Sequence, residues 1–225
     1  MRKKLIVAGI LLVVAIAAIW GGSVIYASVE NGRAADQLSL STPTSGAGPV
    51  GTLDAAELSG TWKISAGSQA GYRVKEVLNG QDVTVVGRTT EVSGEAGIDG
   101  TSLTSATAVV EMSKVATDNG SRDRQFQGIL KTTEFPTSTF TLTSPVDIAA
   151  IAGGSASAEA SGELTIAGVT RAVTVSLKAQ TMDGSVEVQG SIPVTFADFG
   201  IAAPDLGFVK VENTGTIEML LQLKR

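Results

Sequence analysis

The chain has 225 residues, of which 17 are Lys or Arg and 22 are Asp or Glu, and its formal net charge is -5. This acidic balance argues against a nucleic-acid partner, because phosphate binding needs clustered Lys and Arg. The absence of Cys excludes disulfides, thiolate nucleophiles and Cys-ligated zinc. The absence of His removes the commonest general base and transition-metal ligand. We therefore predict a protein that is not an enzyme and that carries no catalytic residue, metal site or cofactor.

The N-terminal segment, residues 1–29, is predicted to be a transmembrane anchor. Three basic residues at positions 2–4 precede an apolar run from Leu5 to Trp20, and weakly apolar sequence continues to Ala27. This is about the 20 residues needed to cross a hydrocarbon core. The positive-inside rule places the basic end in the cytoplasm. We expect a single-pass protein of the cell membrane with its folded part on the extracytoplasmic side; the alternative is a cleaved signal peptide and secretion.

Residues 30–57 are predicted to form a flexible linker. They are rich in Gly, Ser, Thr, Ala and Pro and contain few large apolar side chains. Such a composition buries too little apolar surface to fold by itself. The folded domain is therefore expected to begin at Leu58 and to continue to Arg225.

Within residues 58–225, apolar side chains recur at every second position. The clearest run alternates Glu187, Gln189 and Ser191 with apolar or small residues, and similar alternation continues to the C-terminus. Residues two apart share one face of a strand, so each run predicts a strand with one apolar side. The predicted strands cover residues 61–66, 70–77, 81–90, 102–111, 137–144, 156–166, 169–179, 186–196 and 217–223.

Turn signals separate several of these strands. Asn79-Gly80 and Asp99-Gly100 are typical of two-residue hairpins, because both central residues tolerate positive φ. Long one-sided strands joined as successive hairpins close into a barrel without a free edge. The fold class predicted is all-β: a closed antiparallel barrel of about eight strands, preceded by the N-terminal transmembrane helix.

Residues 121–131 interrupt the alternation with helical spacing. Phe126, Ile129 and Leu130 fall on one face, Ser121 is a candidate N-cap, and Asp123 lies in the first turn. We expect a short amphipathic helix that covers one mouth of the barrel.

Several motifs in this chain resemble the YceI-like family of polyisoprenoid-binding proteins, which have a lipocalin-like barrel. The helical segment Asn119-Gly-Ser-Arg-Asp-Arg-Gln-Phe126 is similar to the family's Arg-Asp helix. The segment Gly162-Glu-Leu-Thr-Ile-Ala-Gly-Val-Thr-Arg-Ala-Val-Thr174 is similar to its most specific hairpin, and Asp198-Phe-Gly-Ile201 to its Asp-Phe-Gly element. The resemblance covers Leu58 to Arg225.

The resemblance implies extracytoplasmic binding or carriage of an isoprenoid-type lipid, such as a polyprenyl or quinone chain, in the barrel lumen. Many relatives carry His in the helix and in the hairpin, where this chain has Arg124 or Gln125 and Ala167. This departure weakens inference about the head group. The alternative is a structural or stress-related surface module whose barrel is filled by its own side chains, without a ligand. The sequence leaves open whether the protein forms a homodimer.

The candidate ligand-binding residues are apolar, with one exception. Arg171 is a charge on an otherwise apolar strand face, so we expect it to point inward, although a strand-end position in solvent is the alternative. The apolar candidates for the lumen wall are Phe126, Leu130, Phe135, Phe140, Phe196, Phe199 and Phe208.

Overall fold

The computed structural model describes residues 24–25, 27–41, 55–182 and 184–225. Its strands are β1 (Gly60–Ile64), β2 (Gln69–Leu78), β3 (Gln81–Thr89), β4 (Val92–Asp99), β5 (Ser102–Glu111), β6 (Thr137–Leu142), β7 (Val146–Asp147), β8 (Ser155–Ile166), β9 (Val169–Met182), β10 (Ser185–Thr195) and β11 (Val209–Lys224). Its helices and 3-10 turns are α2 (Ala55–Leu58), η1 (Met112–Lys114), α3 (Gly120–Ile129), η2 (Ala149–Gly153) and η3 (Phe196–Phe199).

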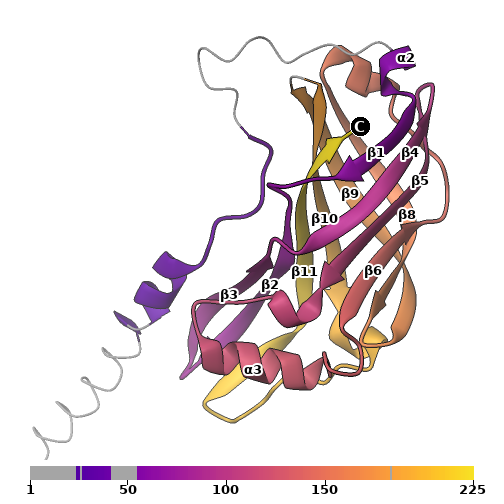
Figure 1. Cartoon of the computed structure of the whole chain (residues 1–225). Coiled ribbons are helices and arrows are strands. Elements are labelled where there is room, and N and C mark those ends of the chain that lie inside the picture. Colours follow the sequence, from indigo (N-terminus) through magenta and orange to yellow (C-terminus); the bar gives the residue numbers. More distant parts are fainter. Residues whose placement is uncertain (1–23, 26, 42–54, 183) are drawn as a thin grey trace, which may run out of the picture.

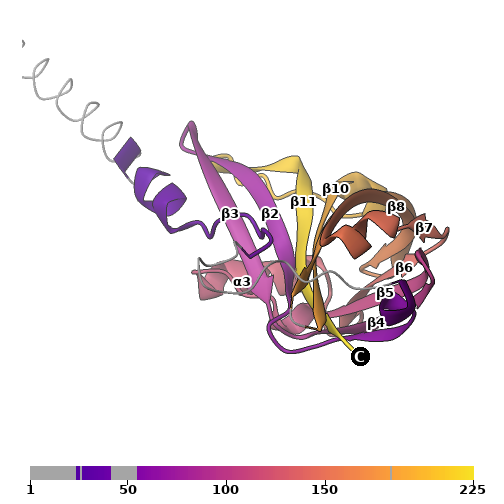
Figure 2. The same ribbon diagram turned by 90° about the horizontal axis from the view of Figure 1, so that it is seen from above.

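Eight strands form a closed antiparallel barrel (Figures 1 and 2). The ring runs β1-β4-β5-β6-β8-β9-β10-β11 and closes where β1 pairs with β11. Strands β2 and β3 extend the walls at the other end, since β2 continues along β11 and β3 pairs with β2. The predicted eight-stranded barrel with a short helix is therefore confirmed.

The predicted turn at Asn79-Gly80 is confirmed, whereas at Asp99-Gly100 only Gly100 has a positive φ, of 59°, because Asp99 is the last residue of β4 and pairs with Ser102. Asn79 and Gly80 both have positive φ, at 50° and 79°, as a two-residue turn between right-twisted strands requires. Ala167 and Gly168 adopt the same conformation, at 49° and 78°, between β8 and β9. An alanine at such a position carries a strain that glycine avoids.

The sequence analysis missed β4, whose inward positions carry small residues. Gly94 and Ala96 face inward there, so the apolar alternation is weak. A Cβ atom at Gly94 would lie 2.0 Å from the carbonyl oxygen of Thr107, so β5 approaches too closely for a side chain. Glycine is thus required at this position by the closeness of the neighbouring strand.

The N-cap of helix α3 lies two residues before the predicted one. Asn119 is the N-cap, and its side chain accepts hydrogen bonds from the backbone N–H groups of Ser121 and Arg122. Ser121 itself lies inside the first turn. The prediction of a short helix is right, while the assignment of Ser121 as its cap is wrong, because the Asn carboxamide reaches two free N–H groups.

The two ends of the barrel differ in how they are filled. At the end near α2, Trp62 is buried and its Nε1 donates to the Leu58 carbonyl oxygen at 2.7 Å. The Arg225 guanidinium carbon lies 5.2 Å from the centre of the Trp62 ring. Packed side chains close this end; α3 lies at the opposite end (Figure 1).

The outer face of the barrel is covered by residues 34–41, which we call the strap. Arg73 Nη2 donates to the Ala35 carbonyl oxygen at 2.7 Å. Farther along, the backbone N–H and hydroxyl of Ser41 donate to the two carboxylate oxygens of Glu187 at 2.7 and 2.8 Å. Glu187 was predicted to face solvent, but it is fully buried beneath the strap.

The strap corrects the prediction of a flexible linker over residues 30–57. Residues 30–41 are held against the sheet by side-chain and backbone hydrogen bonds, so they are part of the folded domain. Composition alone does not reveal this, because the hydrogen-bonding partners lie far along the chain, on β2, β3, β9 and β10. Positions 42–54 are outside the described residues.

Most of the predicted transmembrane segment, residues 1–23 and 26, lies outside the described residues. No helix within the described ranges is both long enough and apolar enough to span a bilayer. Residues 27–33 are helical, and the Asn31 side chain docks on β3 by donating to the Asp82 carbonyl oxygen and accepting from the Thr84 N–H.

Candidate functional site

A cavity of about 490 Å³ occupies the α3 end of the barrel. This volume lies within the range of about 300–1,000 Å³ that is usual for small-molecule sites. Its wall is formed by β2, α3, η3 and the loop that precedes β11, with contributions from β3, β5 and β10. The cavity exists because β3 does not pair with β5, and α3 spans the space between them.

The wall of the cavity is mainly apolar. Val74 and Val85 contribute from the β2–β3 hairpin, and Ile129 and Leu130 from the end of α3. A second void of about 40 Å³ lies deeper and shares Ala70 and three other residues with the cavity. An apolar interior of this kind favours a ligand with a hydrocarbon body.

Two aromatic rings stack across the cavity wall. Tyr72 of β2 and Phe126 of α3 have ring centres 4.9 Å apart and planes that differ by 11°. Gly87 on β3 makes room for the tyrosine, since a Cβ atom there would lie 2.4 Å from its ring. The stack fastens α3 to the hairpin and gives the cavity a flat aromatic surface.

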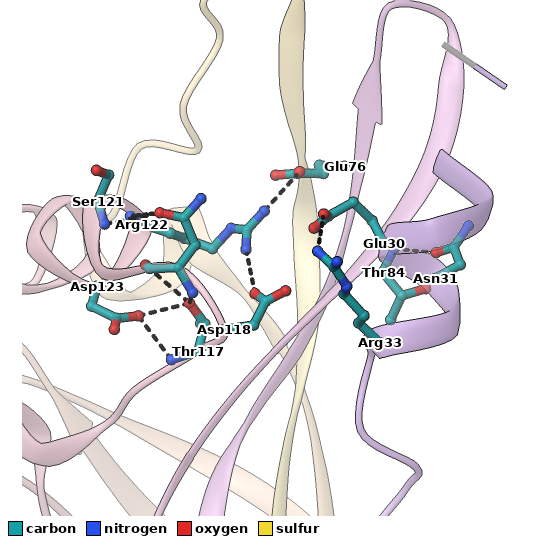
Figure 3. A network of polar contacts seen from close by, with 11 residues as sticks. Glu30, Asn31, Arg33, Glu76, Thr84, Thr117, Asp118, Ser121, Arg122 and Asp123 are labelled. Atoms are coloured by element: carbon teal, nitrogen blue, oxygen red, sulfur yellow. Dashed lines mark hydrogen bonds and ion pairs between the residues drawn. The ribbon is translucent and has the colours of Figure 1, made fainter. Parts of the chain in front are cut away.

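One part of the wall is polar and carries charge. The Arg122 guanidinium of α3 lies between two carboxylates: Nη1 is 2.9 Å from Asp118 Oδ1, and Nη2 is 3.5 Å from Glu76 Oε1 (Figure 3). Arg122 and Glu76 both line the cavity. A ligand whose body fills the apolar part can therefore place hydrogen-bonding atoms here.

The cavity changes the acidity of the groups in its wall. Burial raises the pKa of Glu76 above its usual value, and the neighbouring Arg122 only partly opposes this. Burial also raises the pKa of Tyr72 to about 12, although Arg122 acts in the opposite direction. The phenol is therefore a hydrogen-bond donor at neutral pH.

Asp123 holds the start of α3 and does not line the cavity. Its Oδ1 accepts from the backbone N–H of Thr117 at 2.8 Å and from the Thr117 hydroxyl at 2.7 Å. The two residues of the Arg-Asp motif thus have different roles. Arg122 lines the cavity, and Asp123 hydrogen-bonds to the preceding loop (Figure 3).

The structure gathers five of the eight predicted site residues around the cavity. Phe126 and Leu130 lie on or just after α3, whereas the others come from η3 and the loop before β11. The five are Phe126, Leu130, Phe196, Phe199 and Phe208. Their placement agrees with the prediction; whether they bind a ligand stays a prediction.

Three predicted residues lie elsewhere. Phe140 lines the small deep void, where its ring covers Gly162 of β8. Phe135 packs over the Gly168 backbone. Arg171 is exposed, and its Nη1 donates to the Thr170 carbonyl oxygen at 2.9 Å. The prediction that Arg171 points inward is wrong, because it stands at a strand end next to the β8–β9 turn.

The glycines on the strand faces do not provide the open volume. Gly190 is buried, and a Cβ atom there would lie 2.7 Å from Met219 Cγ. Gly87 is covered by the Tyr72 ring. The open volume arises from the separation of strands at the α3 end, which a search for small residues does not detect.

The sequence analysis missed Tyr72 and Glu76. Both fall on the inward face of β2, in phase with Ala70 and Val74. A charged side chain in phase with apolar residues was the signal at Glu76, as it was at Arg171. Both residues lie two positions from a strand end, but Glu76 is buried and pairs with Arg122 of α3, whereas Arg171 is exposed.

No metal centre is indicated. Among residues 24–25, 27–41, 55–182 and 184–225, no group of three or more Asp or Glu side chains is placed to hold an ion. The Arg122 guanidinium lies where a cation between Glu76 and Asp118 would have to sit.

The comparisons with known proteins agree with this architecture. No curated protein matches the sequence. A polyisoprenoid-binding domain from Saccharophagus degradans matches in structure with a TM-score of 0.59 and 21% identity, over 73% of this chain and 97% of that domain. Burkholderia cenocepacia BcnA matches with a TM-score of 0.53 and 18% identity, over 67% of this chain and 95% of its own. The YceI-like domain matches residues 62–223, so the chain belongs to the YceI-like domain family.

Proposed function

We propose that this protein binds an isoprenoid-type lipid, a polyprenyl or quinone chain, in the cavity at the α3 end of the barrel. The apolar cavity of about 490 Å³, lined by five of the predicted residues, is the observation that carries the proposal. Each buried CH₂ group contributes about 0.8 kcal/mol, so a chain-like ligand can bind tightly through its hydrocarbon body. The similarity to a polyisoprenoid-binding domain supports the ligand class.

We further propose that the protein is a binder or carrier without catalytic activity and that it works outside the cytoplasm, attached through its N-terminal segment. The basic residues at positions 2–4 and the apolar run after them support this placement. The alternative was a surface module whose barrel is filled by its own side chains. The α2 end is filled in this way by Trp62 and its neighbours, whereas the α3 end contains the cavity, which favours the ligand-binding proposal.

The head group of the ligand is proposed to lie beside Arg122. Its guanidinium already has the Glu76 and Asp118 carboxylates as partners, so the cluster carries more negative than positive charge. A phosphate would be repelled by these carboxylates, whereas a carbonyl or hydroxyl can accept or donate hydrogen bonds here. An uncharged head, as in a quinone or a polyprenyl alcohol, therefore fits better than a phosphate.

Native mass spectrometry of the full chain in detergent, purified from a quinone-containing bacterial host, tests the proposal. We expect an isoprenoid adduct that Ala203→Trp removes, because Ala203 lines the cavity. Ala202→Trp is the matched control, since Ala202 is exposed and outside the cavity wall. A protein that stays free of adducts after incubation with quinones and polyprenyl alcohols would contradict ligand binding.

A further inference from the structure

The exposed apolar side chains of the described residues gather at one end of the molecule. Val77 lies near the end of β2, next to the β2–β3 turn. Leu206 and Phe208 lie on the loop before β11, with 56% and 60% of their surfaces exposed. We call these three residues the rim. The other exposed large apolar side chains in the described part of the chain are Val24, Ile25 and Val29.

Hydrogen bonds hold the rim in shape. The backbone N–H of Asn79 donates to the Phe208 carbonyl oxygen at 2.8 Å, which joins the β2–β3 turn to the loop before β11. Within that loop, the Leu206 N–H donates to the Val209 carbonyl oxygen at 2.8 Å. Leu206 and Phe208 also line the cavity, so this part of the rim borders it.

The N-terminal helical residues are fixed at the same end. Asn31 bonds to the backbone of Asp82 and Thr84, near the start of β3, at 2.9 and 2.8 Å. Figure 1 shows this helix beside the β2–β3 hairpin, at the end of the barrel that carries α3. The strap continues from it along the outer face and ends in the Ser41–Glu187 hydrogen bonds. The orientation of the helix relative to the cavity mouth is therefore set by the fold.

Resting on the proposed function, we infer that the rim together with Val24, Ile25 and Val29 contacts the surface of a lipid bilayer, so that the cavity opens onto the membrane. The sequence immediately before residue 24 contains the apolar run Leu5–Trp20 behind three basic residues, which has the length to enter a hydrocarbon core. Val24 and Ile25 continue this apolar character at the surface of the folded part. We take a bilayer as the occupant of this face, because the apolar run that precedes it in the sequence is proposed to anchor the chain in one.

This placement explains how an insoluble ligand reaches the cavity. A hydrocarbon chain that moves from bilayer to cavity along an apolar rim is never exposed to water, so the transfer avoids the cost of hydrating it. The strap keeps the mouth at the membrane, whereas a flexible tether would let the barrel turn away. On this inference the ligand is exchanged at the membrane face of the barrel.

Quenching by membrane-bound nitroxides tests the inference. The chain has no Cys, so a single introduced thiol takes one fluorophore. We expect the full chain in phosphatidylcholine and phosphatidylglycerol vesicles with nitroxide-labelled lipid to be quenched at Val77→Cys and not at Thr101→Cys, in the turn at the opposite end. Val77 does not line the cavity, so its quenching reports on the bilayer. Absent quenching at residue 77, or equal quenching at both positions, would overturn the inference.

Transfer kinetics separate this inference from the proposed function. The double variant Val29→Glu with Val77→Glu should slow the transfer of tritiated geranylgeraniol from vesicles about tenfold or more, since charge replaces apolar contact with lipid. Binding of the same probe in detergent should be unchanged, and Thr101→Glu should alter neither. Unchanged transfer with normal binding would overturn the membrane face alone, whereas lost binding of the unmodified chain in detergent would overturn the carrier function.

Discussion

The two ends of the barrel are made from strands with the same alternating pattern, yet one end is filled and the other is hollow. At the α2 end, β1 pairs with both β4 and β11, so the wall is continuous and Trp62 with its neighbours fills the interior. At the α3 end, β3 does not pair with β5 and a helix covers the interval, which leaves an open cavity. Alternation thus fixes which side of a strand is apolar, while strand pairing decides whether that side meets protein or ligand.

The largest expected contrast is in stability. Trp62→Ala should lower the free energy of unfolding by about 3–5 kcal/mol, because it leaves a cavity in the packed end and removes the hydrogen bond to Leu58. Phe126→Ala at the open end should cost about 1–2 kcal/mol, since its ring is only partly buried. Urea denaturation of both variants and of the unmodified chain measures these changes in the free energy of unfolding. Equal losses would show that the α3 end is packed as firmly as the other.

The next largest effect is expected on the outer face of the open end. Glu218 is buried between two arginines: Arg73 Nε lies 2.7 Å from its Oε1, and Arg88 bonds to its other oxygen. Glu218→Ala should lower the free energy of unfolding by about 3 kcal/mol, because two partly buried cations lose their partner.

The matched control for Glu218 is a solvent-exposed ion pair. Asp205→Ala removes the partner of Lys210, whose Nζ lies 3.8 Å from the carboxylate, and should cost less than about 1 kcal/mol. Thermal unfolding of both variants measures the difference. A loss at Glu218 no larger than at Asp205 would mean that the β2–β3–β11 wall does not depend on this cluster.

A smaller effect is expected on ligand affinity at the polar wall. Arg122→Gln should weaken geranylgeraniol binding about fivefold to tenfold through the loss of one charge-assisted hydrogen bond. Arg124→Gln is the control, because Arg124 is exposed and outside the cavity wall. Geranylgeranyl phosphate should bind more weakly than the alcohol to the unmodified chain. Tighter binding of the phosphate, measured by competition in detergent, would place its head group elsewhere.

The mildest expected effect is the response of stability to acid. Burial alone would raise the pKa of Glu187 and of Glu218, but hydrogen bonds from Ser41, Gln222 and Gln180 to the first, and from both arginines to the second, lower both values. The unfolded chain then binds protons before the folded protein does. Stability should therefore fall as the pH decreases below about 4.5 and through these lowered values.

Glu76 provides the opposing control for the acid response. Its pKa is raised, so its protonation on acidification favours the folded state and offsets part of the loss. Glu76→Gln should therefore show a steeper loss of unfolding free energy with acid than the unmodified chain. A shallower loss would reverse the sign assigned to this carboxyl group.

Sequence patterns predicted most of the strands, the Asn79-Gly80 turn, the helix and most of the aromatic cavity wall, because these depend on local periodicity and turn chemistry. They did not predict the burial of Glu187, which depends on Ser41 reaching it from far along the chain. They also misplaced Arg171, which is exposed, because the element that covers a position near a strand end, as α3 covers Glu76 through Arg122, comes from elsewhere in the chain. The position of the hollow was not predictable from alternation, because it depends on the absence of a ladder between β3 and β5.

The outer edge of β3 has few partners in the described part of the chain. Asn31 covers the backbone near Asp82 and Thr84, and two hydrogen bonds of 2.9 Å between Arg88 and Ala116 are the backbone link from β3 to the segment that carries α3. Breaking that link costs about two ordinary hydrogen bonds, far less than global unfolding. Because this backbone link is so short, the Arg88 and Ala116 amides should exchange with solvent deuterium well before those of β9 and β10, while the Tyr72–Phe126 stack and the Arg122–Glu76 ion pair still hold the hairpin to α3.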